Sequence, residues 1–252
     1  MKIIFIGDIV GKPGRKILKN KLPSLIEKYS PDLIIANGEN AAGGKGLNQR
    51  VADELFESGI DILTMGNHVW DKKEIFNFIQ GDKRIVRPAN YPKGTPGSGF
   101  TKVEVNGKII LILNLSGIVY MPPLDCPFKV IDEMLNVDDY DYSLLDFHGE
   151  ATSEKIAMGW YLNGKIDAVV GTHTHVQTSD YRRLDKGTLY ITDVGMTGPY
   201  NGVLGVKKED VIKKFVTKMP TRFNIETDGP KQLNAVYLDL NSEKIYPIKE
   251  IE

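Results

Sequence analysis

Residues 2–8 read KIIFIGD, and residues 32–40 read DLIIANGEN. Each stretch contains an uninterrupted run of apolar residues, which is typical of a strand that is buried on both faces of a parallel sheet. A glycine and then an acid follow each run, Gly7-Asp8 directly after the first and Gly38-Glu39 one residue after the second. The two stretches therefore predict two parallel strands, each followed by a candidate ligand.

Helical patterns lie between the apolar runs. A glycine-rich turn leads into a predicted helix that continues through Tyr29, and Pro23 should kink or split this helix. A third apolar run follows at residues 60–64, and Asp71 is placed to cap a helix that continues through Gln80. Strand–turn–helix units of this kind predict a parallel sheet with right-handed crossovers.

The middle of the chain adds antiparallel strands. Residues 99–105 and 108–113 flank the pair Asn106-Gly107, which readily accepts the positive φ values of a tight hairpin turn. Similar paired segments recur near the end of the chain. The fold class is therefore α/β with mixed sheets, and the irregular, proline-rich residues 117–127 are expected to form a small cap.

All four histidines follow apolar runs as well. His68 comes after Asn67, His148 ends a run that starts near residue 142, and His173 and His175 form a His-Thr-His motif. Sites in open α/β sheets form outside the carboxyl ends of the strands, so these side chains and the two acids should meet there. On an extended segment, residues two apart point the same way, which would turn both imidazoles of the His-Thr-His motif toward one site.

The converging side chains predict a metal site. Carboxylate, amide oxygen and imidazole suit manganese, iron or zinc better than Cu⁺ or Ca²⁺. The candidate ligands are Asp8, Glu39, Asn40, Asn67, His148, His173 and His175, with His68 beside them. Taken singly, each could be a helix cap, a surface acid or a core histidine. Together they are too many for one transition ion, and two ions roughly 3.5–4 Å apart that share a bridging carboxylate fit the set better.

Composition narrows the class of protein. The chain has 252 residues, of which 41% are hydrophobic and 26% charged, so we expect one domain over 1–252. A net charge of -1 gives no sign of a surface for nucleic acid or anionic membrane. Cys126 is the only cysteine, which excludes an intramolecular disulfide and a cysteine-based zinc site. The longest apolar run is too short to cross a bilayer, and we expect a cytoplasmic protein.

The order and spacing of these residues resemble the motifs of the calcineurin-like metallophosphoesterases. Three departures from the usual motifs are informative: no histidine follows Asp8 two residues later, Glu39 stands where an aspartate is usual, and Val69 replaces an acid. Together with residues 37–44 (NGENAAGG) and 193–198 (DVGMTG), these departures resemble the YmdB-type branch of that superfamily.

The resemblance implies a four-layer α/β/β/α sandwich of the metallophosphoesterase type with two bound ions, iron first, with manganese or zinc as alternatives. The implied ligands of one ion are Asp8, Glu39, Asn40 and His175. Those of the other are Glu39, Asn67, His148 and His173, so that Glu39 bridges the pair. His68 is then not a ligand.

The branch is associated with cleavage of cyclic nucleotides. This implies a phosphodiesterase for 2′,3′-cyclic and also 3′,5′-cyclic nucleotides, in which a hydroxide that bridges the metals attacks phosphorus and His68 protonates the leaving oxygen. The expected partner is a small phosphodiester, with no membrane and no stable nucleic-acid complex, and self-association stays open.

Three alternatives remain. A phosphomonoesterase or nucleotidase could use the same site, and a metal-containing regulatory protein could bind nucleotide or RNA with little turnover. A mononuclear amidohydrolase is disfavoured, because that class usually has an early His-x-His motif, whereas the one in this chain begins at His173.

Overall fold

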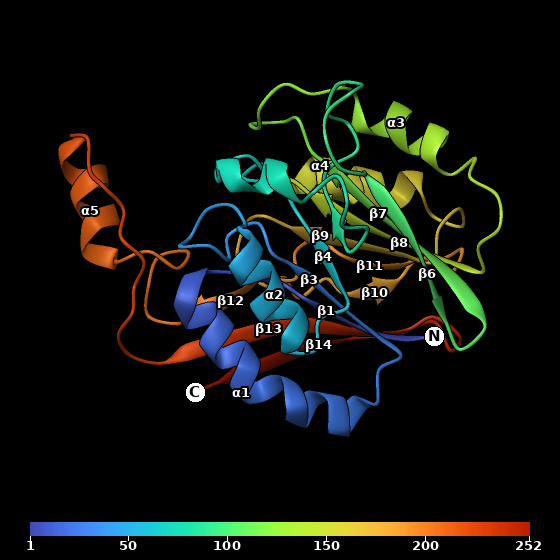
Figure 1. Cartoon of the computed structure of the whole chain (residues 1–252), viewed down its shortest axis with the longest axis horizontal. Coiled ribbons are helices and arrows are strands. Elements are labelled where there is room, and N and C mark those ends of the chain that lie inside the picture. The colour runs from blue at the N-terminus through green and yellow to red at the C-terminus, as the bar shows by residue number, and fades with distance from the viewer.

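The computed structural model describes residues 1–252, and its strands form two mixed sheets (Figure 1). The strands of the larger sheet are, in spatial order, β2 (Asp8–Ile9), β12 (Met196–Pro199), β13 (Lys231–Asp239), β1 (Lys2–Ile6), β3 (Leu33–Asn37), β4 (Ile62–Thr64) and β5 (Ile85–Val86), with β14 (Lys244–Ile251) paired to β13. Those of the smaller sheet are β10 (Arg182–Arg183), β11 (Leu189–Ile191), β9 (Ala168–Thr172), β8 (Tyr142–His148), β7 (Lys108–Ser116) and β6 (Phe100–Val105). The prediction of an α/β fold with mixed sheets is confirmed.

Helices cover the outer faces of the sheets. The helices are α1 (Gly11–Tyr29), α2 (Gln49–Glu57), the short 3₁₀ helix η1 (Lys73–Asn77), α3 (Pro127–Met134), α4 (Thr152–Tyr161) and α5 (Lys208–Thr217). Figure 1 shows α1 and α2 on one side of the strands, α3 and α4 on the other, and α5 standing apart from the rest of the fold. None of these helices combines the length and the apolar character that crossing a membrane requires.

The apolar runs of the sequence are explained by burial on both faces. In β1, Ile4 and Ile6 pack with α1 and α2, while Ile3 and Phe5 pack against strands of the smaller sheet, including Ile112. This is the alternation that a strand imposes, with both faces apolar. A third apolar cluster fills the space between the smaller sheet and helices α3 and α4.

The parallel strands point their carboxyl ends toward one edge of the molecule. β1, β3 and β4 run parallel in the larger sheet, and β7, β8 and β9 run parallel in the smaller one. The two sheets are tied together near this edge by Asn114, whose Nδ2 donates to the carbonyl oxygens of Met65, at 2.5 Å, and Val86, at 2.9 Å. Residues that follow strands of different sheets are therefore brought together.

The local predictions have mixed outcomes. The hairpin of β6 and β7 is confirmed, with φ of 53° at Asn106 and 73° at Gly107. The predicted split at Pro23 is wrong, because α1 continues through it. The helix predicted from Asp71 to Gln80 is also wrong, since only η1 forms there. The reason is that the Asp71 carboxylate bonds to His68 Nδ1 at 3.0 Å instead of capping a helix.

Candidate metal centre

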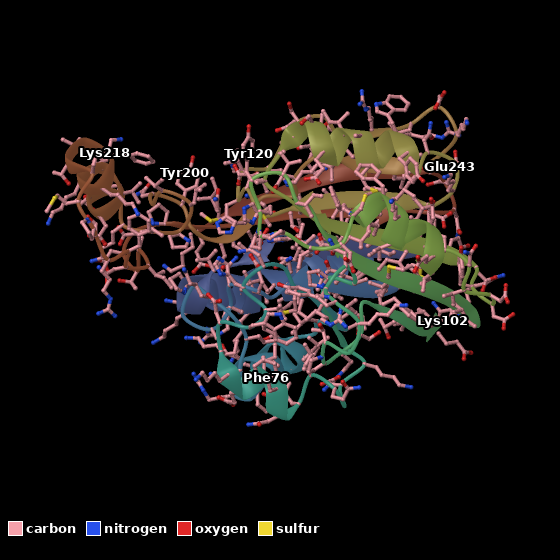
Figure 2. The ribbon with its side chains drawn as sticks, turned by 90° about the horizontal axis from the view of Figure 1, so that it is seen from above. Phe76, Lys102, Tyr120, Tyr200, Lys218 and Glu243 are labelled. Atoms are coloured by element: carbon pink, nitrogen blue, oxygen red, sulfur yellow. The ribbon has the colours of Figure 1, made fainter.

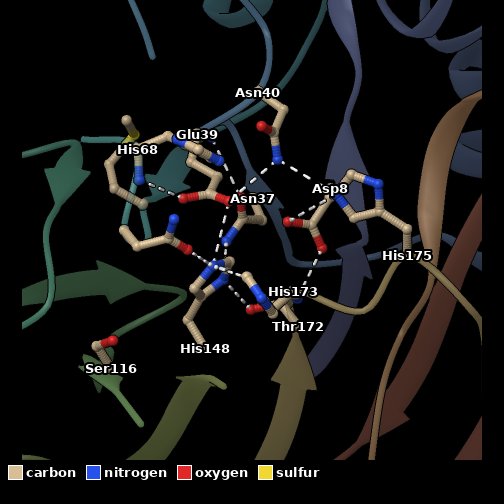
Figure 3. Close-up of polar contacts among 12 residues, drawn as sticks. Asp8, Asn37, Glu39, Asn40, His68, Ser116, His148, Thr172, His173 and His175 are labelled. Carbon is tan, nitrogen blue, oxygen red and sulfur yellow. Dashed lines mark hydrogen bonds and ion pairs between the residues drawn. The ribbon is translucent and has the colours of Figure 1, made fainter. Parts of the chain in front are cut away.

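Glu39 lies at the middle of the polar cluster at this edge (Figure 3). Its Oε1 is 3.1 Å from His148 Nε2 and accepts a hydrogen bond from Asn40 Nδ2 at 3.0 Å. Its Oε2 accepts from the backbone N–H of His68 at 2.9 Å. The carboxylate, which is 1% exposed, therefore faces two groups of side chains at once, as a bridging ligand must.

The first group converges on the Nε2 atom of His148. This nitrogen lies 3.1 Å from Glu39 Oε1, 3.0 Å from Asn67 Oδ1 and 3.0 Å from His173 Nδ1. A single N–H at Nε2 can satisfy only one of three acceptors well. His148 Nε2 and these three atoms are four potential metal ligands that come from four remote segments and lie close together. A metal ion is bound by ligands of these kinds in such an arrangement.

The second group contains Asp8, Asn40 and His175. His175 Nε2 lies 3.8 Å from Asp8 Oδ1 and 3.3 Å from Asn40 Nδ2. Asp8 is fully buried, and its Oδ1 has no hydrogen-bond partner. A buried carboxylate oxygen with no donor is costly unless a cation completes it. Asn40 turns its amide nitrogen toward this point, and a half-turn of the amide would place Oδ1 there instead.

His68 stands at the rim, as predicted. Its Nδ1 is 3.0 Å from Asp71 Oδ2, so an N–H at Nδ1 donates to this carboxylate and Nε2 is left free. His68 also lines a cavity of about 220 Å³ that opens onto both groups of ligands. The lining residues are Glu39, Asn40, His68, Glu150, His173, Thr174, His175 and Leu204.

The reasoning that placed the His-Thr-His motif on an extended segment is wrong. β9 ends at Thr172, and both histidines have positive φ values, 99° at His173 and 66° at His175. Such values are uncommon for residues other than glycine and do not belong to an extended segment. His173 faces His148 and His175 faces Asp8, so the two imidazoles reach the two groups separately.

A buried relay behind His148 was not predicted. The hydroxyl of Thr172 donates to Asp146 Oδ1 at 2.7 Å and can therefore accept from His148 Nδ1, which is 2.8 Å away. Asn37 Nδ2 donates to the other Asp146 oxygen at 3.2 Å. When His148 is neutral, the relay favours the proton on Nδ1, which leaves Nε2 free to bind a metal. The sequence does contain one sign of this relay, which is the acid Asp146 inside the largely apolar strand β8.

A buried ion pair supports the strained turn, and it was not predicted either. Lys155 Nζ donates to Asp193 Oδ2 at 2.7 Å, with the two side chains 1% and 0% exposed. The same carboxylate oxygen accepts from the backbone N–H of Thr174 at 2.9 Å and from its hydroxyl at 2.8 Å. Thr174 separates the two histidines, so Lys155 and Asp193 hold the turn that presents them.

The charges of the cluster follow from burial and from its internal contacts. Burial raises the pKa of Asp8 to about 6, against the opposing effect of His175. Burial also disfavours ionised Glu39, but the contacts with His148 and His68 together outweigh it and lower the pKa of Glu39 to about 2. Burial similarly acts against charged His148, yet Glu39 raises its pKa to about 9. Burial lowers the pKa of His173 to about 3, so this ring stays neutral.

The donor set has the chemistry of a metal site. Glu39, His148 and His173 alone form a group whose potential ligand atoms all lie within 4.8 Å of one another. Asp8 Oδ1 supplies an unpaired buried oxygen on the other side of Glu39. All seven predicted ligands and His68 are therefore brought to one place by the fold.

Comparison with known proteins gives consistent matches over the whole chain. The sequence model of a family described as YmdB-like protein matches residues 4–251. A relative from Bacillus subtilis (strain 168), named 2′,3′-cyclic-nucleotide 2′-phosphodiesterase, is 53% identical over 251 residues, which cover 99% of this chain and 95% of that protein.

Two solved structures have nearly the same fold. A hypothetical protein from Thermus thermophilus superposes with a TM-score of 0.95 at 44% identity and covers 100% of both chains. A phosphatase from Mycoplasma pneumoniae superposes with a TM-score of 0.94 at 39% identity, over 100% of this chain and 94% of that one.

Proposed function

Because this chain belongs to the YmdB-like protein family, we propose that it hydrolyses 2′,3′-cyclic nucleotides at a centre of two metal ions. The family makes the chain a hydrolase of the metallophosphoesterase type, as the sequence motifs predicted. The observation that carries the proposal is the gathering of Glu39, Asn67 and His173 around His148 Nε2, at 3.0–3.1 Å.

The two ions are assigned to the two groups of side chains that Glu39 separates. Asn67, His148 and His173 would hold one ion, and Asp8, Asn40 and His175 the other. When bound, such a pair supplies Lewis-acid polarisation of a phosphate and activation of water. Imidazole, amide and carboxylate ligands suit iron, with manganese or zinc as alternatives.

The protein's own residues supply the proton and the orientation. The Asp71 carboxylate holds an N–H on Nδ1 of His68, which leaves Nε2 to face the cavity. In its protonated form, His68 can give the Nε2 proton to the leaving alkoxide of a phosphodiester. The relay through Thr172 and Asp146 keeps His148 in the orientation that ligation needs.

The substrate assignment rests on the Bacillus subtilis relative, whose name specifies 2′,3′-cyclic nucleotides. Cleavage of 3′,5′-cyclic nucleotides is proposed as a secondary activity. A phosphomonoesterase remains the second candidate, because the similar Mycoplasma pneumoniae structure is named a phosphatase.

The test is a comparison of kcat/KM for 2′,3′-cyclic AMP, 3′,5′-cyclic AMP and the monoester 3′-AMP, with the metal-loaded enzyme. We expect the highest value for the 2′,3′-cyclic nucleotide and loss of all activity with a chelator. Glu39→Gln, which keeps the shape of the side chain, should lose metal and activity together. A higher kcat/KM for the monoester, or activity that survives metal removal, would contradict the proposal.

Two broader assignments complete the proposal. We propose that the three apolar layers make residues 1–252 one four-layer α/β/β/α sandwich, with residues 117–127 as a small cap. We propose a cytoplasmic enzyme that acts on small phosphodiesters without a stable nucleic-acid partner.

A further inference from the structure

An apolar groove lies beside the metal centre, at the base of α5. It has a volume of about 560 Å³. Its lining residues are Val203, Leu204, Val206, Val211, Lys214, Phe215, Lys218 and Phe223, and we call it the arm groove. No acid lines it, and six of its eight lining residues are hydrophobic.

The arm groove is formed by a segment that stands apart from the sheets (Figure 1). The segments on either side of α5, residues 203–207 and 224–226, pair with each other through backbone hydrogen bonds, among them Lys207 N–H to Asn224 O at 2.8 Å and Glu226 N–H to Gly205 O at 3.0 Å. Figure 2 shows Lys218 at the outer end of this segment and Tyr200 on the side of the main body. Solvent therefore reaches the groove, and Phe215 and Phe223 are 66% and 46% exposed.

Leu204 joins the groove to the metal centre. It lines both the arm groove and the 220 Å³ cavity of the ligands. It stands in a tight turn closed by Val203 and Val206, with φ of 52°, and its carbonyl oxygen lies 3.1 Å from His175 Nδ1. An N–H at Nδ1 of His175 donates to this oxygen, so the inner wall of the groove is fixed to a proposed metal ligand.

The groove combines aromatic rings with positive charge. Lys214 Nζ lies 5.2 Å from the centre of the Phe223 ring, and Lys218 Nζ lies 5.7 Å from that of Phe215. Residues 207–223 carry six basic and two acidic side chains, whereas the whole chain has a net charge of -1. This chemistry suits a planar aromatic group that belongs to an anion.

We infer that the arm groove is the subsite for the base of the nucleotide substrate. The inference rests on the proposed function, because it assumes that the phosphate occupies the neighbouring polar cavity. The two cavities then divide an amphipathic ligand between them. The polar cavity takes the phosphate and the groove takes the base against Phe223 and Leu204. Substrates without a base gain nothing from the groove.

Phe223→Ala tests the inference, with Val216→Ala as the matched control. Val216 is an apolar residue of α5 that is 77% exposed and does not line the groove. The substrates are 2′,3′-cyclic AMP and ethylene phosphate, a five-membered cyclic phosphate without a base. Phe223→Ala should raise KM for 2′,3′-cyclic AMP roughly 10-fold, the loss expected when one stacking contact is removed. Its kcat, its metal content and its KM for ethylene phosphate should stay those of the wild type, and Val216→Ala should change nothing.

Three results would overturn the inference. One is an unchanged KM for 2′,3′-cyclic AMP in Phe223→Ala, and another is an equal rise in KM for both substrates. The third is a change in oligomeric state, measured by light scattering after gel filtration, which Phe223→Ala and Val216→Ala share. That result would make the segment an interface between copies of the chain.

A binding measurement separates this inference from the proposed function. Adenosine has a base but no phosphate, and its binding to the metal-loaded protein can be followed by ligand-observed NMR. If Phe223→Ala no longer binds adenosine, the arm groove is supported as the base subsite even if the enzyme proves to prefer monoesters. If adenosine binds the wild type and Phe223→Ala equally well, the arm groove is not the base subsite, whatever the enzyme hydrolyses.

Discussion

At the scale of single residues, the structure separates side chains that hold the centre from one that can move a proton. The lone pairs of Glu39, Asn67 and His173 surround His148 Nε2, whereas His68 reaches the cluster only through its backbone N–H. We therefore propose that His68 acts on substrate and is not needed for metal binding. The sequence predicted that these residues would meet, because each follows a buried strand, whereas their separate roles came from the family resemblance and stay a prediction.

Replacing His68 should separate catalysis from metal binding. His68→Gln should lower kcat by about 10²- to 10⁴-fold, which is the usual contribution of a general acid, with no change in metal content. His148→Gln is the comparison, and it should lose metal and activity together. Metal content by elemental analysis and kcat on 2′,3′-cyclic AMP would be measured on the same samples. Full turnover by His68→Gln would exclude the acid role.

Metal loading should expel protons. In the metal-free protein, the raised pKa of His148, about 9, means that this ring is protonated at pH 7 and must lose its proton to bind a metal. The apparent metal affinity should therefore rise about tenfold per pH unit up to about pH 9. Below about pH 6 the dependence should be steeper, because Asp8 is protonated there as well.

Calorimetric metal titrations at pH 7 in two buffers of different ionisation enthalpy measure this release. We expect about one proton per pair of ions from His148. Equal heats in the two buffers would mean that no proton is released and that His148 is neutral in the metal-free protein.

At the scale of secondary-structure elements, the turn after β9 depends on a partner that is remote in sequence. Lys155 lies in α4, and it holds Asp193, which in turn holds Thr174 between two histidines with positive φ. The sequence could not predict this contact, because a lysine in a helical pattern is normally solvated and its partner lies 38 positions away. The positive φ values of His173 and His175 could not be predicted either, because an apolar run does not indicate how the chain turns after it.

Lys155→Met should destabilise the fold and weaken the centre. It leaves the Asp193 carboxylate buried without its cation, which should lower the free energy of unfolding by about 3–5 kcal/mol. Metal content should fall too, because Thr174 loses a fixed partner. Lys165→Met is the control, since Lys165 and its partner Asp132 are each half-exposed and 3.7 Å apart, and it should cost less than about 1 kcal/mol.

Urea unfolding followed by circular dichroism gives these free energies, and elemental analysis gives the metal content. A variant Lys155→Met that unfolds like the control and keeps its metals would show that the buried pair does not support the turn.

The loop after β4 has no room for a side chain at Gly66. A Cβ there would lie 2.3 Å from His148 Nε2 and 2.4 Å from Glu39 Oε2. Gly66→Ala should therefore push two ligands apart and abolish metal binding while the sheets still fold. Gly81→Ala is the control, because a Cβ at that position meets no atom closer than 3.9 Å. Retention of full metal content by Gly66→Ala would contradict the crowding that the structure implies.

At the scale of the whole molecule, the centre lies where two sheets meet. Glu39 and Asn67 follow strands of the larger sheet, while His148 and His173 belong to strand ends of the smaller one. Much of this was predictable, because buried parallel strands read as apolar runs and their carboxyl ends converge. The two-sheet arrangement itself came from the resemblance, since apolar runs alone do not say which strands share a sheet. The charged residues 207–214 indicate a solvated helix face, and α5 has one, since it buries only Val211; the groove beside it could not be predicted from that pattern.

The most direct test of the central claim is anomalous diffraction from crystals of the protein purified with its own metals, at energies on either side of the metal absorption edges. The account predicts two peaks roughly 3.5–4 Å apart. One should lie among Asn67, His148 and His173 and the other beside Asp8 and His175, with the Glu39 carboxylate between them. A single peak, or two peaks that do not share Glu39, would contradict it.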